Sequence, residues 1–243
     1  MSDPVQLLSA GSMRHAFPAI VMAFKQQSGI AVSLSLGPAG LLRERIEAGE
    51  PFDLFASANM EHPLRLAFAG IVEDVICFAR NRLCVLARAD LGLTTENFLH
   101  ILGEPTVKIG ISTPGDDPSG DYAFDVFDRI GKIHKGMDET LKARARQLVG
   151  GRDSPLMPPG KGVGHLIAEG AADLFLSYYS GARMLEEDPA FNVVEIPRQF
   201  APTIEYGLAL RKDASDDARR LRHFIVSDQG QAILKSFGFL AVE

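Results

Sequence analysis

Apolar positions along the chain fall into short, nearly continuous runs that alternate with longer stretches of helical spacing. Runs such as Leu174-Phe175-Leu176 are typical of strands buried on both faces, as in parallel sheets. The pattern predicts strands over 5–9, 30–36, 53–57, 75–87, 107–112, 172–178, 193–196 and 204–210. It predicts helices over 13–27, 41–48, 63–69, 121–130, 138–148, 162–169, 215–226 and 229–237. This alternation predicts an α/β fold with mostly parallel sheets flanked by helices.

Two long β-rich stretches, 75–87 and 202–210, are placed so that they can carry the chain out of a first lobe and back into it. They predict a discontinuous lobe formed by 1–80 plus 203–243 and an inserted lobe formed by 81–202. Two crossover segments would then act as a hinge, a layout that suits closure around a ligand.

Small-residue turns follow three of the predicted strands and open predicted helices. They are Ser9-Ala10-Gly11-Ser12, Gly37-Pro38-Ala39-Gly40 and Pro118-Ser119-Gly120-Asp121-Tyr122. Small residues let a ligand approach the backbone, and the unpaired N–H groups of a helix start favour negative charge. The turns therefore predict a cage for an oxyanion.

Each turn also has a simpler interpretation. Ser12 and Ser119 are natural helix caps, and capping could be all that they do. The turn at Ala39 offers backbone donors and no hydroxyl, so it could be an ordinary strand-to-helix connection. We expect Asp116 and Asp117 to be solvated turn residues, with metal ligation as the alternative.

Other polar groups are weaker candidates. The breaker-rich stretch 150–162, which contains Gly160 and Lys161, is predicted to be a long functional loop. At the end of the strand 172–178, parity allows one of two tyrosines to face a site, and we select Tyr178 over Tyr179.

Composition narrows the function further. The formal net charge of -6 argues against a nucleic-acid surface, and no apolar run is long enough to span a bilayer. The six histidines lack metal-ligand spacing, and no Gly-x-Ser-x-Gly motif occurs. The sequence therefore predicts a binding protein rather than an enzyme, with no free metal ion.

Cys77 and Cys84 both lie in the predicted strand 75–87. Residues seven apart on a continuous strand point to opposite faces, so we expect buried free thiols rather than a disulfide. Met1-Ser2-Asp3-Pro4 runs directly into the first strand without an export signal. The chain is therefore expected to be either cytoplasmic or a mature sequence whose signal has been removed.

Six segments together resemble the periplasmic molybdate-binding proteins of ABC importers and the related tungstate/molybdate-binding group. They are Ser9–Met13, Leu42–Gly49, Phe52–Ala58, Ala79–Leu83, Ala168–Asp173 and Gln229–Gln231, spread over almost the whole chain. The resemblance implies a two-lobed class II periplasmic-binding-protein fold with molybdate or tungstate held between the lobes. It also implies no other cofactor, an ABC permease as partner, a monomeric state and a periplasmic location.

The resemblance carries five ligand positions over to this chain: Ser12, Ala39, Ser119, Gly160 and Tyr178. Ala39 stands where the family usually has a second serine, so it can offer only its backbone N–H. Additional candidates are Gly11, Pro38, Asp117 and Lys161. The run 116–120 is closer to the tungstate group, in which a carboxylate here can join the metal centre.

Two alternatives remain open. The chain could bind another anion, such as sulfate, phosphate or a small carboxylate, which Ala39 and Lys161 would favour. It could also be a cytoplasmic anion-sensing regulatory domain.

Overall fold

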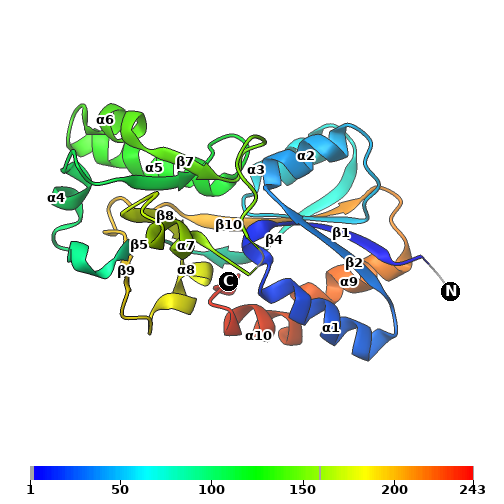
Figure 1. The fold of residues 1–243 in the computed structure, drawn as a ribbon. Helices are drawn as coiled ribbons and strands as arrows, with labels where there is room; N and C mark the ends of the chain where they lie inside the picture. The colour runs from blue at the N-terminus through cyan, green and yellow to red at the C-terminus, as the bar shows by residue number, and fades with distance from the viewer. Residues whose placement is uncertain (1–2, 159, 243) are drawn as a thin grey trace. The chain divides into compact units, whose positions relative to one another are not determined.

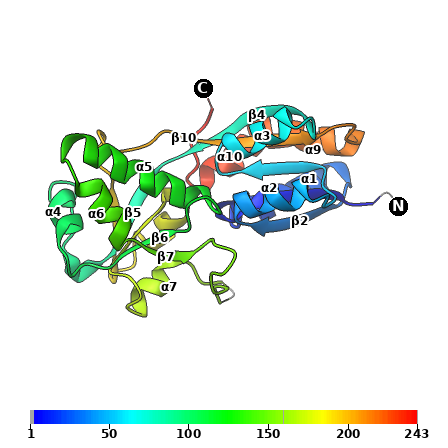
Figure 2. The same ribbon diagram turned by 90° about the horizontal axis from the view of Figure 1, so that it is seen from above.

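The computed structural model describes residues 3–158 and 160–242. These residues form two compact units (Figures 1 and 2). Unit 1 runs up to Asn81 and resumes at Ile204, and unit 2 is the continuous segment Arg82–Thr203. Each unit contains its own five-stranded sheet with helices on it, as the alternation of strand and helix patterns predicts. The prediction of mostly parallel sheets is wrong, because two of the four strand pairings in each sheet are antiparallel.

The sheet of unit 1 has the order β2-β1-β3-β10-β4. Its strands are β2 (Val32–Gly37), β1 (Val5–Ala10), β3 (Leu54–Ser57), β10 (Ile204–Arg211) and β4 (Val72–Asn81). β1 is parallel to both β2 and β3, whereas β10 is antiparallel to β3 and β4. A late segment of the chain therefore completes a sheet that the first segment begins.

Helices cover both faces of this sheet (Figure 1). α2 (Ala39–Glu47) and α3 (Glu61–Phe68) pack together on one face. The other face carries α1 (Ala16–Ser28), α9 (Asp216–Val226) and α10 (Asp228–Ser236). The short 3-10 helix η1 (Gly11–Met13) joins β1 to α1.

The sheet of unit 2 has the order β7-β6-β8-β5-β9. Its strands are β7 (Arg146–Val149), β6 (Ile109–Ser112), β8 (Leu174–Tyr178), β5 (Leu83–Arg88) and β9 (Phe191–Glu195). β6 is parallel to β7 and β8, and β5 is antiparallel to β8 and β9. The helical segments are η2 (Ala89–Leu91), α4 (Phe98–Gly103), α5 (Pro118–Ile133), α6 (Met137–Arg144), α7 (Val163–Ala168), α8 (Tyr179–Ala182) and η3 (Arg183–Leu185).

Two predicted elements are wrong in a way that has a physical reason. The apolar stretch 75–87 forms two strands in different sheets, because the chain leaves unit 1 at Asn81 and β5 begins at Leu83. The predicted helix 138–148 ends at Arg144, and Arg146–Val149 instead form the edge strand β7. β7 is short and only partly buried, so it has no apolar run that would distinguish it from a helix end.

The division of 75–87 into two strands also changes the interpretation of the two cysteines. Cys77 lies on β4 and Cys84 on β5, so the argument from one continuous strand is wrong, although both thiols are free as expected. Cys84 is buried, whereas Cys77 is only half-buried. Burial raises the pKa of the Cys84 thiol to about 12, which keeps it protonated and unreactive.

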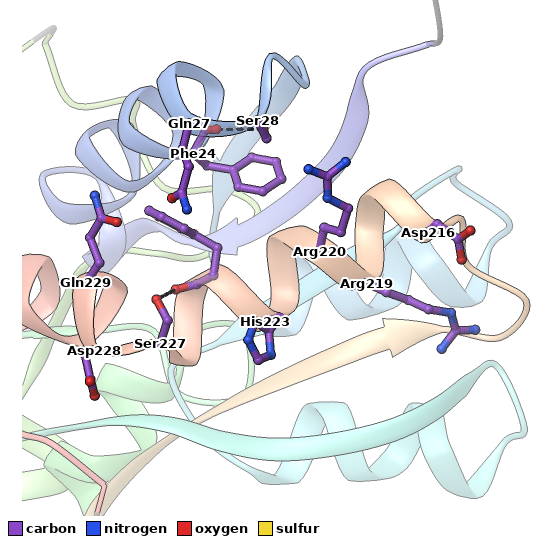
Figure 3. Close-up of a pocket in the computed structure, with 11 residues that line it drawn as sticks. Phe24, Gln27, Ser28, Asp216, Arg219, Arg220, His223, Ser227, Asp228 and Gln229 are labelled. Carbon is purple, nitrogen blue, oxygen red and sulfur yellow. Dashed lines mark hydrogen bonds between the residues drawn. The ribbon is translucent and has the colours of Figure 1, made fainter.

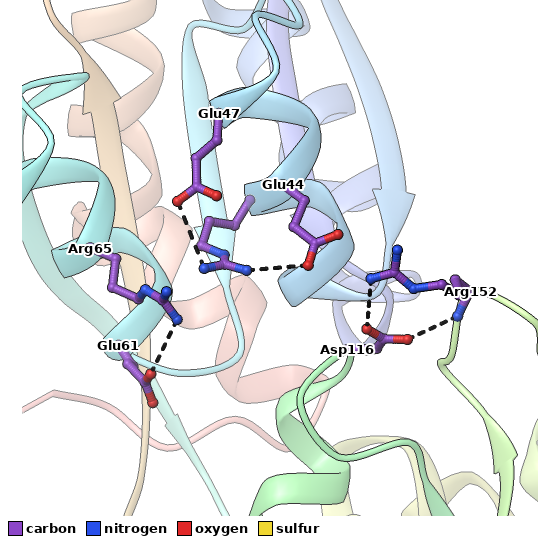
Figure 4. Close-up of polar contacts among 7 residues, drawn as sticks. Glu44, Glu47, Glu61, Arg65, Asp116 and Arg152 are labelled. Atoms are coloured by element: carbon purple, nitrogen blue, oxygen red, sulfur yellow. Dashed lines mark hydrogen bonds and ion pairs between the residues drawn. The ribbon is translucent and has the colours of Figure 1, made fainter.

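A buried histidine, His62, lies in the first turn of α3. His62 is 4% exposed, and neither ring nitrogen has a hydrogen-bond partner among the described residues. Burial lowers the pKa of His62 to about 4, and the charges of Arg43 and Arg65 act in the same direction while Glu44 opposes them. Arg43 itself pairs with Glu44 and Glu47, as Figure 4 shows.

We therefore expect the stability of the protein to fall between pH 6.5 and pH 4. The neutral imidazole of His62 is favoured in the folded state, whereas the unfolded chain takes up a proton with a pKa near 6.5. The contribution is fully present above pH 6.5 and is lost as the pH approaches 4. In urea unfolding at pH 7.0, 5.5 and 4.5, His62→Gln should show a weaker pH dependence than the wild type. The same change at the exposed His100 is the control, and equal slopes for both variants would contradict the expectation.

Candidate functional site

The carboxyl ends of β1 and β2 bring two of the predicted turns together in unit 1. The parallel register pairs Ala10 with Gly37, so the turn at Gly11 and the turn at Pro38 begin side by side. A Cβ placed on Gly11 would lie 3.8 Å from the carbonyl oxygen of Gly37. This edge of the sheet is therefore lined by closely spaced backbone.

The electrostatics of this edge favour an anion. α2 begins at Ala39 with Pro38 as its N-cap, and the N-cap forms no side-chain hydrogen bond. Neither α2 nor η1 has an acidic residue in its first turn. The first N–H groups of α2 have no acceptor within the helix and carry the positive end of its dipole. Negative charge is stabilised at such an end.

Ser12 is not a helix cap, so that interpretation is wrong. It lies inside η1, and α1 begins four residues later, with His15 at its N-cap position and no side-chain capping bond. The Ser12 hydroxyl instead accepts a hydrogen bond from the Tyr206 hydroxyl of β10, at 3.0 Å. A side chain 194 positions away therefore holds Ser12.

In unit 2, the helix α5 is capped by an aspartate rather than by a serine. Asp117 is the N-cap of α5, where its Oδ1 accepts from the Ser119 N–H at 3.1 Å and its Oδ2 accepts from the Ser112 hydroxyl at 3.2 Å. The prediction that Ser119 caps the helix is wrong. Because its N–H is taken, the group that Ser119 can offer to a ligand is its hydroxyl.

The prediction that Asp116 and Asp117 are solvated turn residues is wrong, because both carboxylates accept hydrogen bonds within unit 2. Asp116 accepts hydrogen bonds from the backbone N–H and the guanidinium of Arg152, at 3.0 and 3.4 Å (Figure 4). The Asp117 carboxylate offsets the positive end of α5. The start of α5 is therefore less suited to an anion than the start of α2.

The connection from β6 to α5 is also shaped by close packing of its backbone. A Cβ on Gly120 would lie 2.5 Å from the Pro114 nitrogen and from the Ser112 carbonyl oxygen. A Cβ on Gly150, which has φ of +79°, would lie 2.6 Å from Asp117 Oδ2. Glycine at both positions allows the connection from β6 to α5 to fold tightly against the carboxylate.

Tyr178 lies at the carboxyl end of β8, which is parallel to β6, and is 6% exposed. Its ring meets Tyr122 of α5 edge-on, with 6.4 Å between the ring centroids. The structure therefore brings Tyr178 beside Tyr122, which lies in the first turns of α5. Tyr179 instead begins α8, and the Arg82 guanidinium lies 4.0 Å from the centre of its ring.

Gly160 and Lys161 lie in the loop between β7 and α7, where residue 159 is outside the described residues. Gly160 is exposed with φ of +74°, and the Lys161 N–H donates to the Pro158 carbonyl oxygen at 3.0 Å. Their place in the site stays a prediction from the resemblance.

A hollow of about 730 Å³ in unit 1 lies between α1, α9 and α10 (Figure 3). Its lining includes Phe24, Arg219, Arg220 and Asp228, and none of the predicted ligand residues. Arg219 is paired with Glu73, and charges of both signs line the hollow. It is therefore not a cationic site for an oxyanion.

Within the described residues, no three His, Cys, Asp or Glu side chains gather as a metal-ion site. No helix among residues 3–158 and 160–242 has the length and apolar character needed to cross a membrane.

Comparisons with known proteins agree with this architecture. The family of bacterial extracellular solute-binding proteins matches residues 5–240. An uncharacterized protein of Pasteurella multocida (strain Pm70) is 37% identical over 239 residues, which cover 97% of this chain and 98% of that protein.

Two solved structures are similar in fold. The Azotobacter vinelandii periplasmic molybdate-binding protein has a TM-score of 0.77 at 22% identity, covering 98% of this chain and 100% of that one. The sulfate-binding protein SubI from Mycobacterium tuberculosis H37Rv has a TM-score of 0.78 at 19% identity, covering 100% of this chain and 88% of that one.

These likenesses confirm the predicted two-lobed periplasmic-binding-protein fold. The family is one of solute-binding proteins, and both fold neighbours are named as binding proteins. The chain belongs to the family of bacterial extracellular solute-binding proteins.

Proposed function

We propose that this protein captures a tetrahedral oxyanion, molybdate or tungstate, and delivers it to the permease of an ABC importer. The observation that carries the proposal is the pair of turns at Ser12 and Ala39, which lie side by side with no acid in either first turn. Membership of the solute-binding family supports the binding role, and the molybdate-binding fold neighbour supports the ligand class.

In this proposal, unit 1 contributes the Ser12 hydroxyl and the Ala39 N–H. Gly11 and Pro38 add no bulky polar side chain beside them. Unit 2 contributes the hydroxyls of Ser119 and Tyr178 and the Gly160 N–H. The donors are neutral, so the anion is stabilised by hydrogen bonds and helix dipoles. Closure of the two units, acting as hinged lobes, would exclude water and strengthen each hydrogen bond.

Ligand size would then determine selectivity. A large oxyanion can accept a hydrogen bond from every donor. A smaller one leaves some of these hydrogen bonds unformed, at a cost of about 1–3 kcal/mol each. Ala39 has no hydroxyl, so this chain has one donor fewer than the family that it resembles. Sulfate is for that reason the second candidate ligand.

The proposed location is the periplasm, with the protein acting as a monomer and the permease as its membrane partner. The extracellular character of the family supports this location over a cytoplasmic anion-sensing role.

Calorimetric titration of ligand-free protein should show one molybdate or tungstate bound per chain. Ser12→Ala should weaken binding about tenfold or more, because a hydrogen bond to a charged ligand contributes about 1.5–3 kcal/mol. Ser236→Ala on α10 is the matched control and should bind like the wild type. Sulfate should bind about tenfold more weakly than molybdate.

Sulfate binding that equals or exceeds molybdate binding would replace the proposed ligand by the second candidate. The absence of heat with all three anions would refute the proposed function.

Replacing Asp117 separates capping from ligation. Asp117→Ala should destabilise the protein by about 1 kcal/mol through loss of the α5 cap, lowering Tm by about 2–4 °C. Asp117→Asn retains a capping oxygen, so its Tm should stay near that of the wild type. It should bind molybdate at least as tightly, because one negative charge is removed. Calorimetry and thermal unfolding measure both effects. Weaker binding by Asp117→Asn at an unchanged Tm would instead identify Asp117 as a ligand of the metal centre.

A further inference from the structure

Three polar side chains of unit 1 form a chain of hydrogen bonds that ends at Ser12. The Asn81 Nδ2 donates to the Tyr206 hydroxyl oxygen at 3.2 Å, and the Tyr206 hydroxyl donates to Ser12 Oγ at 3.0 Å. Asn81 is 5% exposed and Tyr206 is fully buried. At such depth, hydrogen bonds are strong and polar groups are confined to a few orientations.

The chain of hydrogen bonds has a direction. The Tyr206 hydroxyl accepts from the Asn81 amide nitrogen, which can only donate, and it donates its own hydrogen to Ser12 Oγ. Ser12 Oγ then accepts from Tyr206, and its own hydrogen must point to another acceptor. Ser12 is therefore arranged as a donor, which is the polarity that an oxyanion requires.

The position of Tyr206 is set by the strands that lead out of unit 1 and back. Asn81 is the last residue of β4, after which the chain enters unit 2, and it pairs with Ile204, where the chain returns. Tyr206 lies two residues further along β10. Its ring meets Phe78 and Phe239 edge-on, with centroid distances of 6.1 and 5.5 Å.

We propose that Asn81 and Tyr206 are positioning residues that fix the Ser12 hydroxyl as a hydrogen-bond donor to the bound oxyanion. This inference rests on the proposed function, because it takes Ser12 to contact the ligand. A purely structural role for Tyr206 would make its hydroxyl matter for stability and not for affinity.

The test uses Tyr206→Phe, which removes the hydroxyl and keeps the ring. Molybdate affinity, measured by calorimetry on the full-length protein, should fall about 3- to 10-fold, because Ser12 then rotates freely and must be ordered on binding. In the Ser12→Ala background the same change should have no further effect, since the hydroxyl that it orients is gone. Asn81→Ala should also weaken binding in the wild-type background and not in Ser12→Ala.

Phe239→Leu is the matched control. It removes a ring contact of Tyr206 and leaves the three polar groups in place, so it should lower Tm without changing affinity. If Phe239→Leu weakens binding as much as Tyr206→Phe, loosened packing explains the loss and the positioning role is overturned. Additive effects of Tyr206→Phe and Ser12→Ala would overturn it as well.

The outcomes distinguish failure of the positioning role from failure of the proposed function. Wild-type affinity in Tyr206→Phe, with weak binding in Ser12→Ala, refutes the positioning role and leaves the proposed function intact. Wild-type affinity in Ser12→Ala removes the proposed ligand contact and refutes the positioning role with it. No binding of molybdate, tungstate or sulfate by the wild type refutes both.

Discussion

The pairing of β10 between β3 and β4 is the interaction on which the rest of unit 1 depends. Without it, β3 and β4 would each expose an unpaired edge, and the sheet would end after three strands. β10 follows all of unit 2 in the chain, so these pairings span more than a hundred residues. Contacts of this separation close a long loop, which costs conformational entropy and slows folding. The same strand delivers Tyr206 to Ser12, and thus links the completion of the sheet to the candidate site.

The start of α2 in unit 1 and the start of α5 in unit 2 differ in their electrostatics, although each follows the carboxyl end of a strand in a parallel pair. The first turn of α2 contains no acidic residue and its N-cap forms no side-chain hydrogen bond, so the helix dipole is not offset there. At the start of α5, the Asp117 carboxylate already accepts from Ser112 and Ser119. The start of α2 can therefore attract an anion through backbone dipoles. Under the proposed function, unit 2 would contribute mainly through the hydroxyls of Ser119 and Tyr178.

Much of the fold could be predicted from the sequence because long apolar runs produce buried strands whatever their partners. Elements that are short or partly exposed, such as β7, α4 and α8, give no comparable signal. The N-cap of α5 is harder to predict from the sequence. Asp117 and Ser119 are both suitable caps two positions apart, and the backbone dihedral angles decide between them. The contact of Ser12 with Tyr206 could not be predicted, because it depends on the register of β10 in the sheet. The sequence around Ser12 or Tyr206 contains no pattern that determines this register.

The direct pairing of Asn81 with Ile204 places the two attachment points of unit 2 on neighbouring strands of one sheet. An inserted segment whose ends meet in this way resembles a cassette, because any replacement needs only two adjacent ends to join the same frame. Recombination could exchange the continuous segment while unit 1 kept its sheet. The discontinuous unit has no such freedom, because its halves must be inherited together. Within one gene, the two parts of this protein are therefore open to evolutionary change at different rates.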